Sequence, residues 1–192
     1  MSKTQSNMME LGAVAPAFEL VDVVSGQATG RDDVAAAADG RGLLVMFICV
    51  HCPYVKHVER ELARIGVDYA GKIGIAAISA NDVAAYPEDS PGEMKAQAER
   101  LGFRFPYLYD ETQEVARAYA AACTPDFFLY DAEMKLVYRG QLDDSRPRRG
   151  DHGNDVPVTG KDLRAAMDAV VAGKRPETNQ RSSVGCNIKW RE

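Results

Sequence analysis

Two cysteines and a histidine stand within four residues of one another, at Cys49, His51 and Cys52. They follow an apolar run over residues 43–48, and they precede Pro53, where an amphipathic pattern with helical spacing begins. A thiol reacts as its thiolate, and a helix N-terminus lowers a thiol pKa through unpaired backbone N–H groups and a positive dipole end. The sequence therefore predicts a reactive or redox thiol at Cys52, the cysteine beside the helix start.

Two basic side chains flank this thiol. His51 precedes Cys52, and Lys56 falls in the first turn of the predicted helix. A positive charge on either would lower the pKa of the Cys52 thiol. Ordinary solvation of both side chains is the alternative.

The other three cysteines are candidates for a second thiol. Cys49 ends the apolar run and is either a redox partner or a buried small hydrophobe. Cys123, just before Thr124-Pro125, is a candidate resolving or local thiol. Cys186 lies near the C-terminus and either returns to the site as a distant resolving cysteine or is structural.

Composition limits the function classes. The chain has 192 residues, 46% of them hydrophobic, which is enough for one domain over 1–192 with a core of about 13–173 and a tail over 174–192. A net charge of −5 does not favour a nucleic-acid partner. No signal peptide or membrane-spanning run is readable, so we expect a cytoplasmic protein. In a reducing compartment, cysteines are more often catalytic or metal-binding than structural disulfides.

The elements that position the cysteines alternate between strand and helix. The apolar run 43–48 predicts a central strand, the apolar positions after Pro53 predict a helix, and residues 72–79 predict a second strand. Two strands joined by one helix form a parallel, right-handed unit. The apolar face of this helix carries Val55, Val58, Leu62 and Ile65.

Further elements surround this unit. Residues 16–30 predict a hairpin turning at Ser25-Gly26, and 126–130 with 135–141 predict another. Ser90 with Glu93 predicts a capping box for a helix that ends at Gly102, and 110–113 would open a helix burying Val115, Ala118 and Tyr119. Thr159 would cap a last helix ending at Gly173, after a long loop over 143–158. The tail has no clear period until Ile188 and Trp190.

This α/β order resembles the thioredoxin fold with an N-terminal β-hairpin, a helical insertion and a C-terminal extension. Thioredoxins carry W-C-G-P-C-K at the start of their first helix. Without gaps, VMFICVHCPYVK places Cys52 on the first, nucleophilic cysteine and Val55 on the second, resolving one. Cys49 and Cys52 have the spacing of the redox pair, but displaced three residues toward the strand. The resemblance therefore implies a nucleophile at Cys52 without a resolving cysteine at the usual position, which Val55 occupies.

Thr124-Pro125 is similar in position to the cis-proline that thioredoxin-like proteins place opposite the active cysteine. The resemblance implies a cis bond beside Cys52, with the Thr124 backbone presented to an extended peptide or thiol. A trans proline at a strand start is the alternative. The predicted substrate-binding residues are His51, Pro53, Lys56, Thr124 and Pro125.

The whole chain resembles the peroxiredoxin-like, AhpC/TSA-related branch of that superfamily. The matching stretches are FICVHCPYVKH, FPYLYDETQEVA, CTPDFFLYD, YRGQLDDSRP and VGCNIKW. The resemblance implies a thiol-dependent redox or antioxidant role without one defined substrate.

Hydroperoxide reduction is the first alternative function. Typical peroxiredoxins use P-x-x-x-T-x-x-C, but Val45 and Cys49 replace the Pro and the Thr here. The hydroxyl that polarises the peroxide is therefore missing, and peroxide reduction ranks below disulfide chemistry. Arg139 or Arg146 could supply a guanidinium. Asp143 and Asp144 could accept a proton near the site, but turn capping is favoured.

A metal-binding protein without turnover is the second alternative. Copper chaperones of this fold use C-x-x-x-C with a distant histidine, for which only His152 is available, and that spacing does not match. We predict no bound metal and no organic cofactor. The candidate soft or borderline ligands would be Cys49, His51, Cys52, His57, Cys123 and Cys186.

The sequence favours a thiol-disulfide oxidoreductase. Cys52 would attack a disulfide or an oxidised sulfur and form a mixed disulfide. A second thiol, from Cys123, Cys186 or another molecule, would resolve it, with a Cys49–Cys52 disulfide as the competing outcome. The expected partners are a thiol reductant and a disulfide-containing protein or small thiol.

Overall fold

A computed structural model describes residues 3–148 and 153–191. Among these, seven strands form one mixed sheet and three form a smaller antiparallel sheet. In spatial order the large sheet contains β3 (Ala28–Gly30), β2 (Glu19–Asp22), β6 (Tyr107–Tyr109), β5 (Gly74–Ser79), β4 (Gly42–Phe47), β8 (Asp126–Asp131) and β9 (Leu136–Gly140). The small sheet contains β1 (Lys3–Gln5), β10 (Val184–Asn187) and β7 (Cys123–Thr124).

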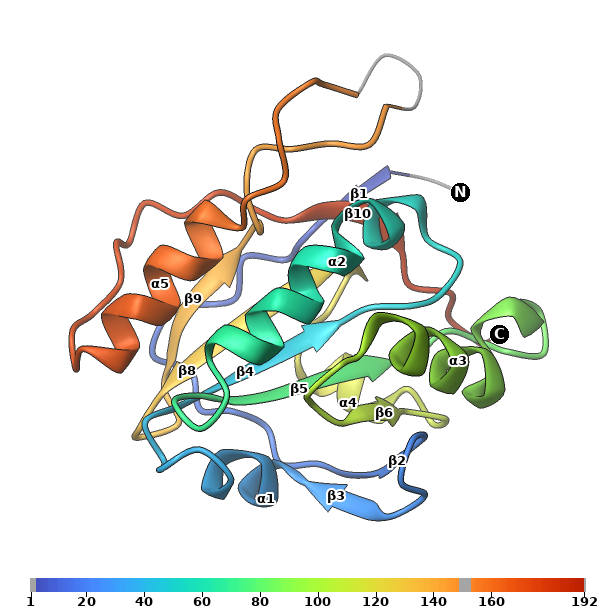
Figure 1. The fold of residues 1–192 in the computed structure, drawn as a ribbon, viewed down its shortest axis with the longest axis horizontal. Helices are drawn as coiled ribbons and strands as arrows, with labels where there is room; N and C mark the ends of the chain where they lie inside the picture. Colours follow the sequence, from blue (N-terminus) through green and yellow to red (C-terminus); the bar gives the residue numbers. More distant parts are fainter. Residues whose placement is uncertain (1–2, 149–152, 192) are drawn as a thin grey trace.

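Helices cover both faces of the large sheet, as the central apolar strands require. Every residue of β4 and β5 is buried. One core cluster joins α2 (Pro53–Asp68), α3 (Pro91–Leu101) and α5 (Lys161–Val171) to one face, and Figure 1 shows these helices in front of the sheet. A second cluster packs α1 (Arg31–Ala36) and α4 (Glu114–Ala118) against the other face.

The central prediction is confirmed: this is an α/β thioredoxin-like fold. Strands β4 and β5 pair in parallel and are joined by α2. The hairpins β2–β3 and β8–β9 are antiparallel, and α3 ends at Gly102, whose φ of 68° suits a glycine. The helical insertion consists of the 3-10 turn η1 (Pro87–Asp89) and α3.

Two local predictions about helix starts differ from the structure. Ser90 is the N-cap residue of α3, as predicted, but its side chain makes no capping hydrogen bond. The next helix, α4, begins at Glu114 rather than at 110–113, so Ala116 is buried in place of Ala118, which is exposed. Asp110 instead accepts the backbone N–H of Ala116 at 2.8 Å.

The last helix also starts differently. Its N-cap is Gly160, at a φ of 67°, and not Thr159. The carboxylate of Asp143 accepts the backbone N–H groups of Thr159 and Gly160, both at 2.7 Å. A buried acidic side chain from the preceding loop therefore takes the capping role predicted for Thr159.

The C-terminal tail is structured where no period was predicted. Val184–Asn187 form β10, which lies between β1 and β7 and makes antiparallel pairs with both. Figure 1 shows β10 beside the N-terminal end of α2. The tail therefore reaches the helix start that carries the cysteines.

Candidate active site

Cys52 is the N-cap residue of α2. Strand β4 ends at Phe47, four residues form the bend, and Pro53 occupies the first helical position, where its missing N–H costs nothing. The Cys52 side chain has no exposed surface, and its Sγ lies 3.2 Å from the carbonyl oxygen of Thr124. The thiol thus lies at the positive end of the α2 dipole and faces the loop at Thr124 and Pro125.

The neighbours of Cys52 favour its thiolate. Burial alone would raise the pKa of this thiol, but hydrogen bonds from Cys186, Cys49 and Thr124 and from the backbone N–H of Val55 outweigh burial and lower it. Each of these donors stabilises a negative sulfur. Cys52 is therefore the thiol with the lowered pKa, as expected of a nucleophile at a helix start.

Cys49 has the opposite character. It is buried at the end of β4, and its Sγ lies 3.3 Å from Oγ1 of Thr124. Burial raises the pKa of Cys49, and its hydrogen bond to Cys52 and the nearby Asp89 carboxylate raise it further. Cys49 therefore stays protonated beside a Cys52 thiolate.

The other two cysteines lie on neighbouring strands of the small sheet. Cys186 on β10 pairs with Thr124 on β7, and its thiol is hydrogen-bonded to Cys52. Cys123 precedes Thr124 on β7, so its side chain points to the opposite face, and its Sγ lies 3.6 Å from the carbonyl oxygen of Pro125. Burial raises the pKa of Cys123. Cys49 and Cys186 both hydrogen-bond to Cys52.

The Thr124–Pro125 bond is cis, as predicted. The loop lies beside Cys52, because the Thr124 carbonyl faces its sulfur and the Thr124 hydroxyl faces that of Cys49. One residue therefore contacts both thiols of the strand-to-helix bend.

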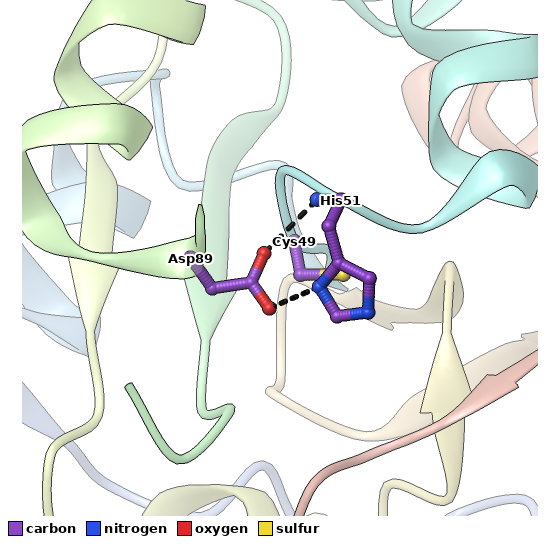
Figure 2. Close-up of side chains that lie close together, drawn as sticks. All are labelled: Cys49, His51 and Asp89. Carbon is purple, nitrogen blue, oxygen red and sulfur yellow. Dashed lines mark hydrogen bonds and ion pairs between the residues drawn. The ribbon is translucent and has the colours of Figure 1, made fainter. Parts of the chain in front are cut away.

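His51 is held by a carboxylate that the sequence did not reveal. Asp89, at the end of η1, accepts the His51 backbone N–H at 3.0 Å and lies 2.5 Å from its ring Nδ1. Figure 2 shows the imidazole turned toward Asp89, with Cys49 beside the pair. The ring stacks on Tyr86, and its Nε2 atom is buried without a hydrogen-bond partner among the described residues.

Asp89 also organises the bend itself. It is fully buried and further accepts the backbone N–H of Val50 at 2.8 Å and the side-chain amide of Asn81 at 2.8 Å. The sequence Pro87-Glu88-Asp89-Ser90 resembles a helix-start turn, so nothing in it marked Asp89 as part of the site.

The remaining predicted site residues lie on α2 and in the segment between β9 and α5. Lys56 is exposed on α2, and Pro53 is half-buried at its start. Asp143 is buried and caps the turn at Ser145, while Asp144 forms ion pairs with Lys161 and Arg181.

Both arginines considered for peroxide binding are engaged in structural contacts. Arg139 donates to the Met9 carbonyl and to the Gln180 side chain. Arg146 donates to the carbonyls of Asp143 and Ser145. His152 lies outside the described residues.

Cys49, His51 and Asp89 offer ligand atoms within 4.8 Å of one another, and no other such group of three occurs in the described part of the chain. The set does not fit a metal ion well. Both Asp89 oxygens are already occupied by four donors, and Nδ1 of His51 is one of them. An ion bound there would have to replace the bonds that hold the bend.

Comparison with known proteins gives two relatives of the thiol-disulfide oxidoreductase class. Over 143 residues, covering 72% of this chain and 75% of the relative, the sequence is 27% identical to thiol-disulfide oxidoreductase ResA from Geobacillus kaustophilus. A similar match, 28% identical over 139 residues, is to ResA from Geobacillus thermodenitrificans.

Solved structures give closer matches. An uncharacterized conserved protein from Geobacillus kaustophilus is 52% identical, with a TM-score of 0.91 over 100% of this chain and 97% of that one. A hypothetical protein from Sinorhizobium meliloti 1021 is 48% identical, with a TM-score of 0.90 over 98% of both. A DsbE-like protein from Chlorobium tepidum, 18% identical with a TM-score of 0.60 over 85% of this chain and 99% of that one, shares the fold.

In the described residues, no helix has both the length and the apolar character needed to cross a membrane. The family model of AhpC/TSA proteins matches residues 11–139, which include the strand-to-helix bend, Asp89 and the cis-proline loop. This chain belongs to the AhpC/TSA family.

Proposed function

We propose that this protein is a thiol-disulfide oxidoreductase that uses Cys52 as its nucleophile. The observation that carries the proposal is the environment of the Cys52 sulfur, which lies at the N-terminus of α2 among donors that lower its pKa. A thiolate of this kind attacks a disulfide sulfur and forms a mixed disulfide. The distant ResA relatives support the same class of reaction.

The loop at Thr124 and Pro125 is the proposed docking position for the substrate. The Thr124 carbonyl faces the Cys52 sulfur, and the Thr124 hydroxyl lies 3.3 Å from the Cys49 sulfur. His51 and Pro53 border the same position, with Lys56 on the exposed side of α2. The proposed partners are a disulfide-bearing protein or small thiol and a thiol reductant.

Hydroperoxide reduction is less well supported. The position three residues before the nucleophile carries the Cys49 thiol instead of a hydroxyl. The guanidinium groups of Arg139 and Arg146 are committed to backbone carbonyls. A peroxide would therefore lack the donors that polarise its oxygens.

The test is disulfide reductase turnover in wild type, Cys52→Ser and Cys49→Ser. We expect Cys52→Ser to abolish turnover and Cys49→Ser to retain a substantial part of it. Equal loss in both variants would instead indicate a Cys49–Cys52 dithiol pair. Absence of activity toward disulfides and peroxides, together with metal in protein purified without chelator, would favour the metal-binding alternative.

A further inference from the structure

The C-terminal segment Ser183–Arg191, here called the strap, covers the proposed nucleophile. Its strand β10 pairs with β7, with Cys186 opposite Thr124, and packs against α2. Cys52 has no exposed surface beneath it. Because Cys52 has no exposed surface, an external disulfide cannot reach its sulfur while the strap is in place.

The strap ends in contacts with three separate parts of the fold. The backbone N–H of Ile188 donates to the Ala122 carbonyl at 3.2 Å, and that of Lys189 donates to Oδ1 of Asn81 at 2.9 Å. Trp190 stacks on the guanidinium of Arg117, 4.5 Å from the ring centroid. In addition, β10 is the central strand of the small sheet and pairs with both β1 and β7, and the side chain of Gln113 donates to the Lys189 carbonyl at 2.8 Å. These bonds fix the strap in a defined register, and release of the strap has to break them.

Gly185 allows the strap to approach β7 closely. A Cβ atom on this residue would lie 1.9 Å from the Thr124 carbonyl oxygen, far inside contact distance. The same carbonyl faces the Cys52 sulfur. A glycine at this position is therefore what lets the following residue, Cys186, reach Cys52.

We propose that Cys186 is the resolving thiol and that the strap alternates with the substrate at the β7 edge. The strap leaves to admit a disulfide to Cys52, and its return places Cys186 on Cys52 and expels the product. This inference rests on the proposed function and names the second thiol of that reaction.

The chemistry balances with one external reductant. The Cys52 thiolate attacks a substrate disulfide R–S–S–R′, forming Cys52–S–S–R and releasing R′S⁻, which takes up a proton. Cys186 then loses its proton, attacks the Cys52 sulfur and forms a Cys52–Cys186 disulfide, while RS⁻ leaves and is protonated. The substrate has gained two electrons from the two thiols. A dithiol reductant restores Cys52 and Cys186.

Cys186 suits this role better than the other two cysteines. Cys49 also contacts Cys52, but burial and the nearby Asp89 raise its pKa and so disfavour its thiolate. The Cys123 thiol donates to the Pro125 carbonyl, and burial raises its pKa. Cys186 alone lies on the segment whose return would displace a substrate from the Thr124 edge.

The first test follows the two steps with 5,5′-dithiobis(2-nitrobenzoate). Attack by Cys52 releases one thionitrobenzoate, and resolution of the mixed disulfide releases a second. We expect both releases in wild type, and both releases at a lower rate in Cys49→Ser, because this change weakens a donor to Cys52. In Cys186→Ser we expect only the first, with a Cys52 adduct found by peptide mass mapping. A second release at the wild-type rate in Cys186→Ser would overturn the role of Cys186. A first release that survives in Cys52→Ser would overturn the proposed function itself.

The second test moves the strap without touching a thiol. Gly185→Ala should push β10 away from Thr124, whereas Gly92→Ala, at an open position on α3, is the matched control. Trp190 is the only tryptophan of the chain, so its fluorescence reports the state of the strap. We expect red-shifted emission in Gly185→Ala, with about tenfold faster alkylation of Cys52 and about tenfold slower resolution.

Two results of the second test would contradict the proposal. One is wild-type emission, alkylation and resolution in Gly185→Ala, which would show that close approach of the strap is not needed. The other is shifted emission with unchanged Cys52 reactivity, which would show that the strap does not cover the thiol. If Gly185→Ala fails to fold by circular dichroism, the Cys186→Ser result decides the role of Cys186.

Discussion

Asp89 bonds to His51 twice, through the backbone N–H at 3.0 Å and through the ring Nδ1 at 2.5 Å. The two residues come from different elements, the bend before α2 and the turn η1 of the inserted segment. Together with the N–H of Val50, these bonds fix the path of the chain between Cys49 and Cys52. The geometry of the thiols therefore depends on a carboxylate that belongs to the insertion.

Asp89→Asn should destabilise the protein and disturb the thiol site. All four donors to Asp89 require an acceptor, and an amide nitrogen cannot provide one. We expect a loss of about 2 kcal/mol in the free energy of unfolding, measured in urea, because a buried donor is left unpaired. The exposed neighbour Glu88→Gln is the control. Wild-type stability and Cys52 alkylation in Asp89→Asn would show that the bend does not need this carboxylate.

The centre of the fold could be predicted because its signals are local. The buried strand β4, the period of α2 and the buried strand β5 are each readable over a few consecutive residues, and the position of Cys52 at the helix start follows from them. The cis-proline prediction followed from a family resemblance rather than from periodicity. Both the helix start and the cis bond agree with the structure.

The parts that were missed depend on contacts between distant segments. The sequence Val184-Gly185-Cys186-Asn187 has no apolar alternation, and it becomes a strand because β1 and β7 supply partners on both sides. Asp89 reads as a turn residue, and its role appears only when His51, 38 residues earlier, is brought beside it. Such pairings are set by tertiary structure, which local periodicity does not encode.

Glu61→Gln should loosen the packing between α2 and α5. Glu61 is buried on α2, and its Oε1 accepts from Nε of Arg164 on α5 at 2.6 Å. Removing the charge of Glu61 leaves the Arg164 guanidinium partly desolvated without this partner. Arg164 still forms its ion pair with Asp68, at 2.9 Å. We expect about 2 kcal/mol of destabilisation, measured by urea unfolding. The exposed Glu99→Gln should have almost no effect, and an equal effect of both changes would contradict the role of the ion pair.

Asp126 should make stability fall as the pH rises through weakly acidic values. Burial raises the pKa of this carboxyl to about 6, above its ordinary value of 3.8, despite backbone hydrogen bonds that lower it. The folded state therefore prefers the protonated form, and this contribution is complete below the unfolded pKa and lost as the pH rises through about 6.

The measurement is urea unfolding of wild type and Asp126→Asn between pH 4 and 7. Subtracting one curve of unfolding free energy against pH from the other cancels the contributions of the other carboxylates. We expect wild type to lose stability relative to Asp126→Asn over this interval, by an amount on the order of 2 kcal/mol. A difference that stays constant with pH would show that Asp126 titrates normally.

The last prediction concerns the different ionisation of the two thiols at the bend. Because hydrogen bonds from Cys186, Cys49 and Thr124 outweigh burial and lower the pKa of Cys52, its alkylation rate should change little between pH 7 and 9. An ordinary thiol with a pKa of about 8.5 would accelerate about twentyfold over that interval. Cys49 should stay unmodified, since burial, Cys52 and Asp89 raise its pKa. Cys49→Ser weakens a donor to Cys52 and should raise the pH at which Cys52 reacts.

The same ionisation affects stability. The folded pKa of Cys52 lies below its unfolded value, so the contribution of the thiolate to stability is complete above the unfolded pKa and is lost as the pH falls toward the folded pKa. Wild type should therefore gain stability relative to Cys52→Ser as the pH rises to about 8.5. Mass mapping of the alkylated peptides over graded pH checks the order of reaction, and modification of Cys49 or Cys186 before Cys52 would refute it.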